Sequence, residues 1–210
     1  MGQVYDTIDD KLAAWIGRQP LFFVATAPMD AAGHVNVSPK GEPAATLRIT
    51  GPTTAAYLDL TGSGIETVAH LRENGRIVLM FCAFTGPPKI VRLHGQGRVV
   101  PAADPEFATL LAHFQPDADT RRMMRSIIVV EVSLITDSCG FVVPRMDYVG
   151  EREQLQRWSE RQEAKRGDGW KQTYWQANNT ASIDGLTGLD PAEPANPEET
   201  RAFSSAGRAL

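Results

Sequence analysis

The chain has 210 residues, 42% of them hydrophobic, and a formal net charge of −4, so it can bury the core of one compact domain. Its sequence pI near 5.6 means that the protein as a whole is not positively charged at pH 7, which argues against nucleic acid as a principal partner. Two cysteines are too few for a disulfide framework, and we therefore expect a reducing compartment.

The N-terminal segment predicts a helix and not a targeting sequence. Residues 7–18 place Ile8, Leu12 and Ile16 on one helical face, with acidic residues in the first turn. A signal peptide would need basic and then apolar residues here, and no apolar run in the chain approaches the roughly 20 residues of a membrane span. We expect a cytoplasmic protein that makes no contact with membranes.

Seven runs rich in apolar and β-branched residues follow this helix, with turn residues between most of them. They lie near residues 21–27, 34–38, 44–50, 55–60, 76–84, 89–100 and 127–135. Six or seven strands are enough to close a small barrel and remove its edges. The predicted fold is therefore mainly β (α+β), a barrel with peripheral helices.

Two further helices are predicted after the sixth run. Residues 104–113 form one, with Pro105 in the first turn, where proline is tolerated. A polar stretch follows over residues 115–125. The second helix spans residues 151–165, where a narrow apolar seam crosses a highly charged segment.

The composition divides the chain into three parts. We expect a barrel domain over residues 1–150 and a C-terminal helix with an Asn/Gly-rich segment over residues 151–189, packed on the barrel or on a partner subunit. Residues 174–186 of this segment suit either a cover over a planar ligand or partner, or a plain loop. Residues 190–210 lack apolar periodicity and predict a flexible tail.

The most informative local pattern surrounds a Gly62-Ser63-Gly64 turn. It predicts a strand, the turn, one short helix and a second strand. A small polar turn that opens a helix leaves backbone N–H groups unpaired at the positive end of the helix dipole, which suits a phosphate group. Ser63 and Thr67 would cap this helix, contact the phosphate, or do both, since the two roles are compatible.

The order of these segments, over roughly residues 8–150, resembles the flavin-binding split barrels of the pyridoxamine 5′-phosphate oxidase-like family. Three short pieces carry the resemblance: Asn36-Val37-Ser38-Pro39-Lys40-Gly41, then Gly62-Ser63-Gly64-Ile65-Glu66-Thr67 with Asn74-Gly75-Arg76, then Val91-Arg92-Leu93-His94-Gly95. The resemblance implies an FMN-binding split β-barrel that forms a homodimer, with two sites at the subunit interface. It also implies two-electron transfer to or from a small organic molecule.

The resemblance further implies which residues bind FMN. Ser38, Pro39, Lys40 and Gly41 resemble a run beside the flavin, where Lys40 and backbone N–H groups would polarise the ring. Ser63 and Thr67 would hold the phosphate; Thr67 stands where better-known relatives carry the lysine of a Ser-Arg-Lys clamp. Glu66 replaces the arginine of that clamp and cannot bind phosphate, which puts pyridoxamine phosphate oxidation itself in doubt.

Lys89 and Arg92 are the candidates for the missing phosphate cation, because their strand resembles one that contacts FMN in the family. Three residues apart on a strand, they point to opposite faces, so one of them is expected to reach the site. Arg48 and Arg76 are weaker alternatives, for each of which a plain ion pair is the simpler expectation.

Other catalytic chemistries find no support in the sequence. No His/Asp/Glu spacing fits a metal site, Cys139 is expected to be buried, and no catalytic residue is assigned. Flavin chemistry makes few demands for acid or base residues, because the isoalloxazine ring carries the electrons. The alternatives are a deazaflavin-dependent reductase and a non-catalytic protein that binds flavin or haem.

Overall fold

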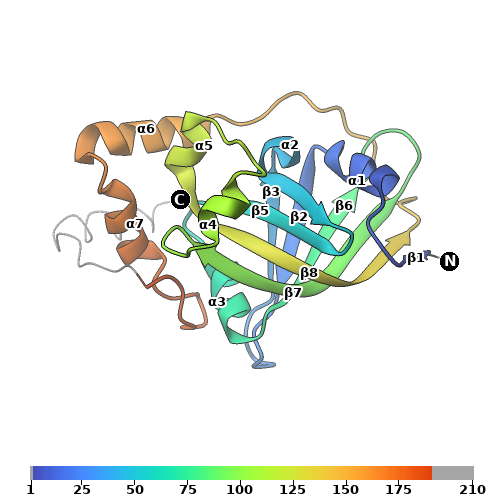
Figure 1. Cartoon of the computed structure of the whole chain (residues 1–210), viewed down its shortest axis with the longest axis horizontal. Helices are drawn as coiled ribbons and strands as arrows, with labels where there is room; N and C mark the ends of the chain where they lie inside the picture. The colour runs from blue at the N-terminus through green and yellow to red at the C-terminus, as the bar shows by residue number, and fades with distance from the viewer. Residues whose placement is uncertain (1, 191–210) are drawn as a thin grey trace.

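The computed structural model describes residues 2–190, whose strands form one antiparallel sheet curled around a core (Figure 1). The strand order is β3-β2-β6-β7-β8-β5-β4, and β1 pairs with β8. The strands are β1 Val4–Tyr5, β2 Leu21–Thr26, β3 Asn36–Gly41, β4 Leu47–Gly51, β5 Thr54–Leu60, β6 Arg76–Cys82, β7 Ile90–Pro101 and β8 Met124–Ser138. The helices are α1 Asp10–Gly17, α2 Pro43–Thr46, α3 Glu66–Glu73, α4 Phe107–Leu111, α5 Ala118–Met123, α6 Gln154–Arg166 and α7 Trp170–Asn178.

The sheet is a split barrel and not a closed one. The predicted mainly β barrel with peripheral helices is confirmed, but β3 pairs only with β2, and β4 only with β5, within the described residues. The described strands therefore leave two edges, at β3 and β4, as a split barrel does. Helix α2 separates the two edge strands, and it begins directly after Glu42, whose backbone is left-handed with φ 51°.

The interior of the curled sheet is filled by aromatic and branched side chains. Phe22 of β2 packs against Tyr57 of β5 and Phe81 of β6, with ring centroids 5.6 and 5.8 Å apart. Strand β5 is buried on both faces, because Tyr57 faces this interior while Leu58 joins a second cluster that includes Leu110 of α4. Burial on both sides explains why β5 is a continuous apolar run with few polar residues.

The first predicted helix is observed, and its cap explains its start. The Asp9 carboxylate accepts a hydrogen bond from the backbone N–H of Leu12 at 2.7 Å, and Leu12 and Ile16 face the core. Helices α4 and α6 lie within the ranges predicted for them or one residue beyond.

Helices α5 and α7 were not predicted from the sequence. Both fall in polar segments that favour loops by composition. Tertiary packing explains α7: Trp170 is 1% exposed and packs edge-on against Trp158 of α6 at 5.2 Å between ring centroids. Such burial offsets the weak helix propensity of the surrounding glycine and asparagine residues.

Helices α6 and α7 lie at one end of the molecule, and the N-terminal strand β1 lies at the other (Figure 1). A long irregular segment after β8 connects the barrel to α6, and the chain after α7 returns toward α3. Most of the predicted flexible tail, residues 191–210, lies outside the described residues. Within residues 2–190, no helix is both long and apolar enough to cross a membrane.

Helix α3 packs on β2 through a buried histidine. The His70 side chain is 0% exposed, and its Nδ1 lies 2.9 Å from the Thr26 hydroxyl. Burial lowers the pKa of His70 below its usual 6.5, although the carboxylates of Asp184, Glu66 and Glu73 act in the opposite direction. The folded protein therefore holds this ring uncharged at pH 7.

This histidine makes a pH dependence of stability testable. The unfolded chain binds a proton at His70 near pH 6.5, whereas the folded chain does so only at lower pH. The free energy of unfolding should therefore fall as the pH drops from 7 to 5, by up to about 1.4 kcal/mol per pH unit. Urea unfolding at several pH values should show this loss in the wild type and a smaller one in His70→Gln.

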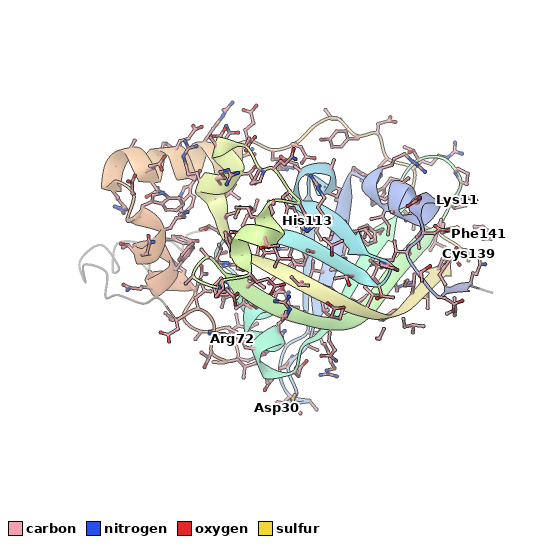
Figure 2. All side chains as sticks on the ribbon, viewed as in Figure 1. Lys11, Asp30, Arg72, His113, Cys139 and Phe141 are labelled. Carbon is pink, nitrogen blue, oxygen red and sulfur yellow. The ribbon has the colours of Figure 1, made fainter. Side chains whose placement is uncertain are left out.

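His113→Gln is the matched control, because His113 is exposed beside α4 (Figure 2). It should follow the wild-type pH profile. Equal slopes for the wild type and His70→Gln would contradict the role assigned to His70.

Candidate functional site

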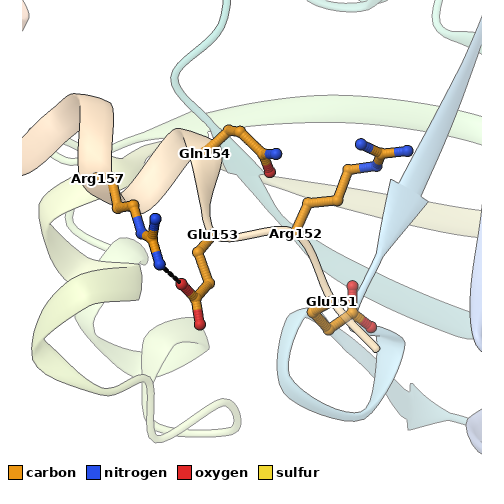
Figure 3. Close-up of a pocket in the computed structure, with 5 residues that line it drawn as sticks. All are labelled: Glu151, Arg152, Glu153, Gln154 and Arg157. Carbon is orange, nitrogen blue, oxygen red and sulfur yellow. Dashed lines mark hydrogen bonds and ion pairs between the residues drawn. The ribbon is translucent and has the colours of Figure 1, made fainter. Parts of the chain in front are cut away.

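Two hollows are candidates for a binding site, and one of them lies where α6 begins. It has a cavity volume of about 260 Å³ and is lined by Glu151, Arg152, Glu153, Gln154 and Arg157 (Figure 3). Its charges are of both signs, and Glu153 and Arg157 pair with each other across one turn of the helix. None of the predicted site residues lines this hollow.

The second hollow, which we call the turn pocket, brings together segments far apart in the sequence. It has a cavity volume of about 250 Å³ and lies between β3, the start of α3 and the start of β8. The lining residues are Asn36, Ser38, Pro39, Lys40, Asp59, Leu60, Gly62, Gly64, Glu66, Thr67 and Arg125. Four of the predicted site residues, Ser38, Pro39, Lys40 and Thr67, therefore meet in one place.

Strand β3 supplies one wall of the turn pocket, because every second side chain of the strand faces the same side. Asn36, Ser38 and Lys40 are the half-buried positions of this edge strand. The Ser38 hydroxyl donates to the Asn36 side-chain oxygen at 3.3 Å, and the Asn36 amide donates to the Thr67 hydroxyl oxygen at 3.1 Å. Because Thr67 accepts this bond, its own O–H remains available to donate into the pocket.

The turn and the first residues of α3 supply the opposite wall. The N-cap residue of α3 is Ile65, and its side chain makes no capping hydrogen bond in the described part of the chain. Within residues 2–190, the backbone N–H groups from Gly62 to Thr67 donate to no acceptor. Unpaired N–H groups at the positive end of a helix form an anion-binding arrangement. The capping alternative for Ser63 and Thr67 is thus not what the structure shows.

A buried ion pair forms the floor of the turn pocket. Arg125 Nε donates to Asp59 Oδ2 at 2.7 Å, Arg125 Nη2 donates to Asp59 Oδ1 at 3.1 Å, and the Ser126 hydroxyl donates to Asp59 Oδ2 at 3.2 Å. Side-chain exposure is 4% for Arg125 and 2% for Asp59. Burial alone would raise the pKa of the Asp59 carboxyl, but the Arg125 guanidinium outweighs it and holds that pKa below its usual value, with help from Lys40.

Sequence reasoning missed Asn36, Asp59 and Arg125 as site residues. Two of the three had a usable signal: Asp59 interrupts the apolar run of β5, and Arg125 stands next to the apolar run of β8. Charged residues inside strands are rarely buried unless paired, so this pattern predicts a buried pair. The register that joins them, with Asp59 opposite Ser126, comes only from the fold.

Two predicted site residues lie near the turn pocket but do not line it. Gly41 is exposed and lies against the Glu151 carboxylate. Ser63 occupies the exposed tip of the turn between Gly62 and Gly64, which do line the pocket.

The predicted cations Lys89 and Arg92 are engaged elsewhere. Lys89 Nζ lies 2.9 Å from the Tyr5 hydroxyl and 3.3 Å from the Asp137 carboxylate, where it fastens β1 to β8. Arg92 donates to the Ser138 hydroxyl at 3.0 Å. In this chain neither residue lines the turn pocket, because both belong to the part of the sheet next to β1.

Arg48 and Arg76, the two weaker candidates for the phosphate cation, do not form the ion pairs expected for them within residues 2–190. Arg48 donates to backbone carbonyl oxygens, including that of His113 at 2.9 Å, and Arg76 donates to that of Pro28 at 2.9 Å. Within residues 2–190 neither forms the ion pair that we expected.

The expectation that Cys139 is buried is wrong. The predicted buried thiol is exposed, just beyond β8 and beside Phe141 (Figure 2). In the part of the chain that the structure describes, no group of three or more His, Cys, Asp or Glu side chains is placed to hold a metal ion.

Comparison with known proteins identifies relatives over most of the chain. The family model described as pyridoxamine 5′-phosphate oxidase matches residues 8–139. The pyridoxamine 5′-phosphate oxidase family protein ustO of Aspergillus flavus is 37% identical over 197 residues, which cover 90% of this chain and 78% of that protein.

The solved structures that match this chain share less sequence identity with it than ustO does. HupZ of Group A Streptococcus matches with a TM-score of 0.46 and 22% identity, over 61% of this chain and 91% of its own. An FMN-binding protein of Syntrophomonas wolfei matches with a TM-score of 0.46 and 15% identity, over 62% of this chain and 88% of its own.

Proposed function

Because this chain belongs to the pyridoxamine 5′-phosphate oxidase family, we propose that it binds FMN in the turn pocket and acts as an oxidoreductase on a small organic molecule. The observation that carries the proposal is the meeting of a free lysine, a free threonine O–H and unpaired backbone N–H groups in one hollow. When bound, FMN would supply the two-electron chemistry, which the chain lacks by itself.

The turn pocket fits the phosphate of a flavin by its donor set. Lys40 has no ion-pair partner among residues 2–190, so its charge is available to a ligand. Arg125 is balanced by Asp59, and Glu66 adds one further negative charge to the lining. We therefore assign the role of phosphate cation to Lys40, in place of Lys89 and Arg92. Glu66 limits how strongly the site attracts a dianion.

The residues of the pocket would bind and orient the cofactor, and no acid or base residue is assigned. Thr67 O–H and the N–H groups of the turn would donate to phosphate oxygens, while the Ser38–Asn36–Thr67 chain of hydrogen bonds holds β3 at a fixed distance from α3. Leu60 and Pro39 supply the apolar part of the lining.

We also propose that the protein works as a homodimer. A cavity of about 250 Å³ is smaller than the roughly 300–1,000 Å³ typical of pockets for cofactors and drug-sized ligands. Val35, just before β3, and Val37 within it alternate with the pocket-lining Asn36 and Ser38 and are 69% and 58% exposed. Exposed apolar side chains beside an incomplete site are expected where a second subunit completes that site.

The lining also discriminates between the alternative cofactors. Among the described residues of one chain, none that lines the turn pocket is a His, Cys, Met or Tyr, the side chains that ligate haem iron. The deazaflavin analogue of FMN carries a longer anionic tail, which would need more free cations than Lys40 alone. FMN is the cofactor that the lining favours.

A titration of the purified protein with FMN, riboflavin, the deazaflavin cofactor and haem tests the proposal. We expect FMN to bind with micromolar or tighter affinity and riboflavin to bind at least about tenfold more weakly, because riboflavin lacks the phosphate. Absorbance and quenching of flavin fluorescence give both affinities. Equal affinity for FMN and riboflavin would remove the phosphate site, and preference for the deazaflavin or haem would move the function to those classes.

A further inference from the structure

The chain beyond α7 returns to the turn that carries the proposed phosphate site. Asn179, the first residue after α7, is 0% exposed although it is polar. Its side-chain amide donates to the carbonyl oxygens of Gly62 at 3.0 Å and Ser63 at 3.3 Å. A residue 117 positions away in sequence from Gly62 thus holds the backbone of the turn.

Arg125 holds the same turn from the side of the barrel. Its Nη1 donates to the Gly64 carbonyl oxygen at 3.0 Å, and also to the side-chain oxygen of Asn179 at 3.0 Å. The two side chains fix each other, because the guanidinium donates to the amide oxygen and leaves the amide nitrogen to donate to the turn. Three consecutive carbonyl oxygens of the turn are held by this pair.

Holding the carbonyl oxygens fixes the rest of each peptide group. A peptide unit is planar, and its N–H points away from its C=O. With the carbonyls of residues 62–64 engaged by Arg125 and Asn179, the N–H groups of the following residues remain without protein acceptors within residues 2–190. Gly62, Gly64, Glu66 and Thr67 of this same stretch line the turn pocket.

Three further contacts keep Asn179 in place. Trp175 donates its indole N–H to the Thr61 hydroxyl oxygen at 3.1 Å. The N–H of Leu189 donates to the Asn179 carbonyl oxygen at 2.7 Å, which closes the segment into a loop. Arg72 of α3 donates to the carbonyl oxygen of Gly188, at the place on α3 labelled in Figure 2.

Gly188 shows how closely this loop is fitted to the turn. A Cβ atom at this position would overlap the Asn179 carbonyl oxygen and would lie 2.8 Å from a carbon of Ile65, the N-cap residue of α3. The loop therefore reaches the start of α3 at van der Waals contact.

We propose that Asn179 is a positioning residue of the phosphate site: together with Arg125 it draws the carbonyl oxygens of residues 62–64 away from the turn pocket and leaves the N–H groups of residues 63–65 to the phosphate of the cofactor. This inference rests on the proposed function. It gives the C-terminal segment a part in the specificity for a phosphorylated flavin.

The test compares affinities for FMN and riboflavin in Asn179→Ala and Asn179→Asp. Aspartate keeps the acceptor for Arg125 but cannot donate to the carbonyls, so it tests the donor role with little change in size. We expect each variant to bind FMN about tenfold more weakly than the wild type does, with riboflavin affinity unchanged within about twofold. Both affinities are measured on folded protein. A loss of FMN affinity alone indicates a positioning role, whereas general destabilisation would weaken the binding of both ligands.

Asn178→Ala is the matched control. It removes the same amide one residue earlier, where the side chain makes one hydrogen bond within residues 2–190, to the Tyr174 carbonyl oxygen at 3.0 Å. This variant should keep the wild-type preference for FMN. If the Asn179 variants keep that preference too, or lose affinity for FMN and riboflavin equally, the inference is wrong while the proposed function stands. If the wild type itself binds no flavin, both fail.

Discussion

Replacing Arg125 with methionine is expected to lower the free energy of unfolding by about 3–5 kcal/mol, the largest single effect that we predict. The substitution leaves the Asp59 carboxylate buried with the Ser126 hydroxyl as its one remaining hydrogen-bond donor among residues 2–190. An unpaired charge in this position loses its solvation without compensation. Urea unfolding at pH 7 measures the loss.

The same variant should show a distinctive pH dependence. Without Arg125, burial dominates and raises the pKa of Asp59, so the folded variant binds a proton at higher pH than the unfolded chain does. The stability of Arg125→Met should therefore recover relative to the wild type as the pH falls from 7 toward 4. In the wild type the pKa of Asp59 is lowered, and the contribution of the pair is lost only as the pH falls below about 3.8.

Two controls make the Arg125 result specific. Arg98→Met breaks an exposed pair with Glu106 and should cost less than about 1 kcal/mol. The double variant Asp59→Leu/Arg125→Met removes both charges and should regain much of the stability lost in Arg125→Met. A single variant no less stable than Arg98→Met would show that the buried pair does not have the role assigned to it.

Replacing Lys40 with methionine is expected to weaken FMN binding by about 10- to 100-fold, because it removes the one free cation that residues 2–190 place in the turn pocket. Riboflavin binding should change by less than about twofold. The difference between the two ligands isolates the phosphate, and fluorescence titration measures it. Lys40→Arg should retain part of the affinity, since the charge is kept.

Lys89→Met is the matched control for Lys40. It removes the same charge from a residue engaged by Tyr5 and Asp137, outside the turn pocket. We expect it to leave the preference for FMN unchanged and to lower stability slightly. Equal effects of Lys40→Met and Lys89→Met on FMN binding would overturn the assignment of the phosphate cation to Lys40.

The strands were predictable because burial in a sheet imposes a pattern on neighbouring residues. Strand β2 alternates between buried and half-buried positions, and β5 is apolar from Ala55 to Leu58 because it is covered on both faces. Helix α7 was not predictable, since its stability comes from contact with Trp158 in another helix and not from local propensity.

The residues of the candidate site also fall into a group that the sequence could predict and a group that it could not. Ser38, Lys40 and Thr67 carry their chemistry in short local motifs and meet in one pocket. Asp59 and Arg125 acquire their role only from the pairing of β5 with β8. Lys89 is a local motif residue that does not reach the site. Its charge is already engaged by Tyr5 and Asp137, which lie 84 and 48 positions away in the sequence.

The turn pocket is lined by β3, the end of β5, the turn before α3, the start of α3 and the start of β8, and the segment after α7 holds that turn, so no part of the chain forms the pocket alone. A ligand held there binds the folded chain and not the unfolded one. At one hundred times its dissociation constant, such a ligand adds about 2.7 kcal/mol to the stability of the fold. If flavin binds there as proposed, cofactor supply would govern the lifetime of the protein as well as its chemistry, because chains made without flavin would unfold more often and be degraded sooner.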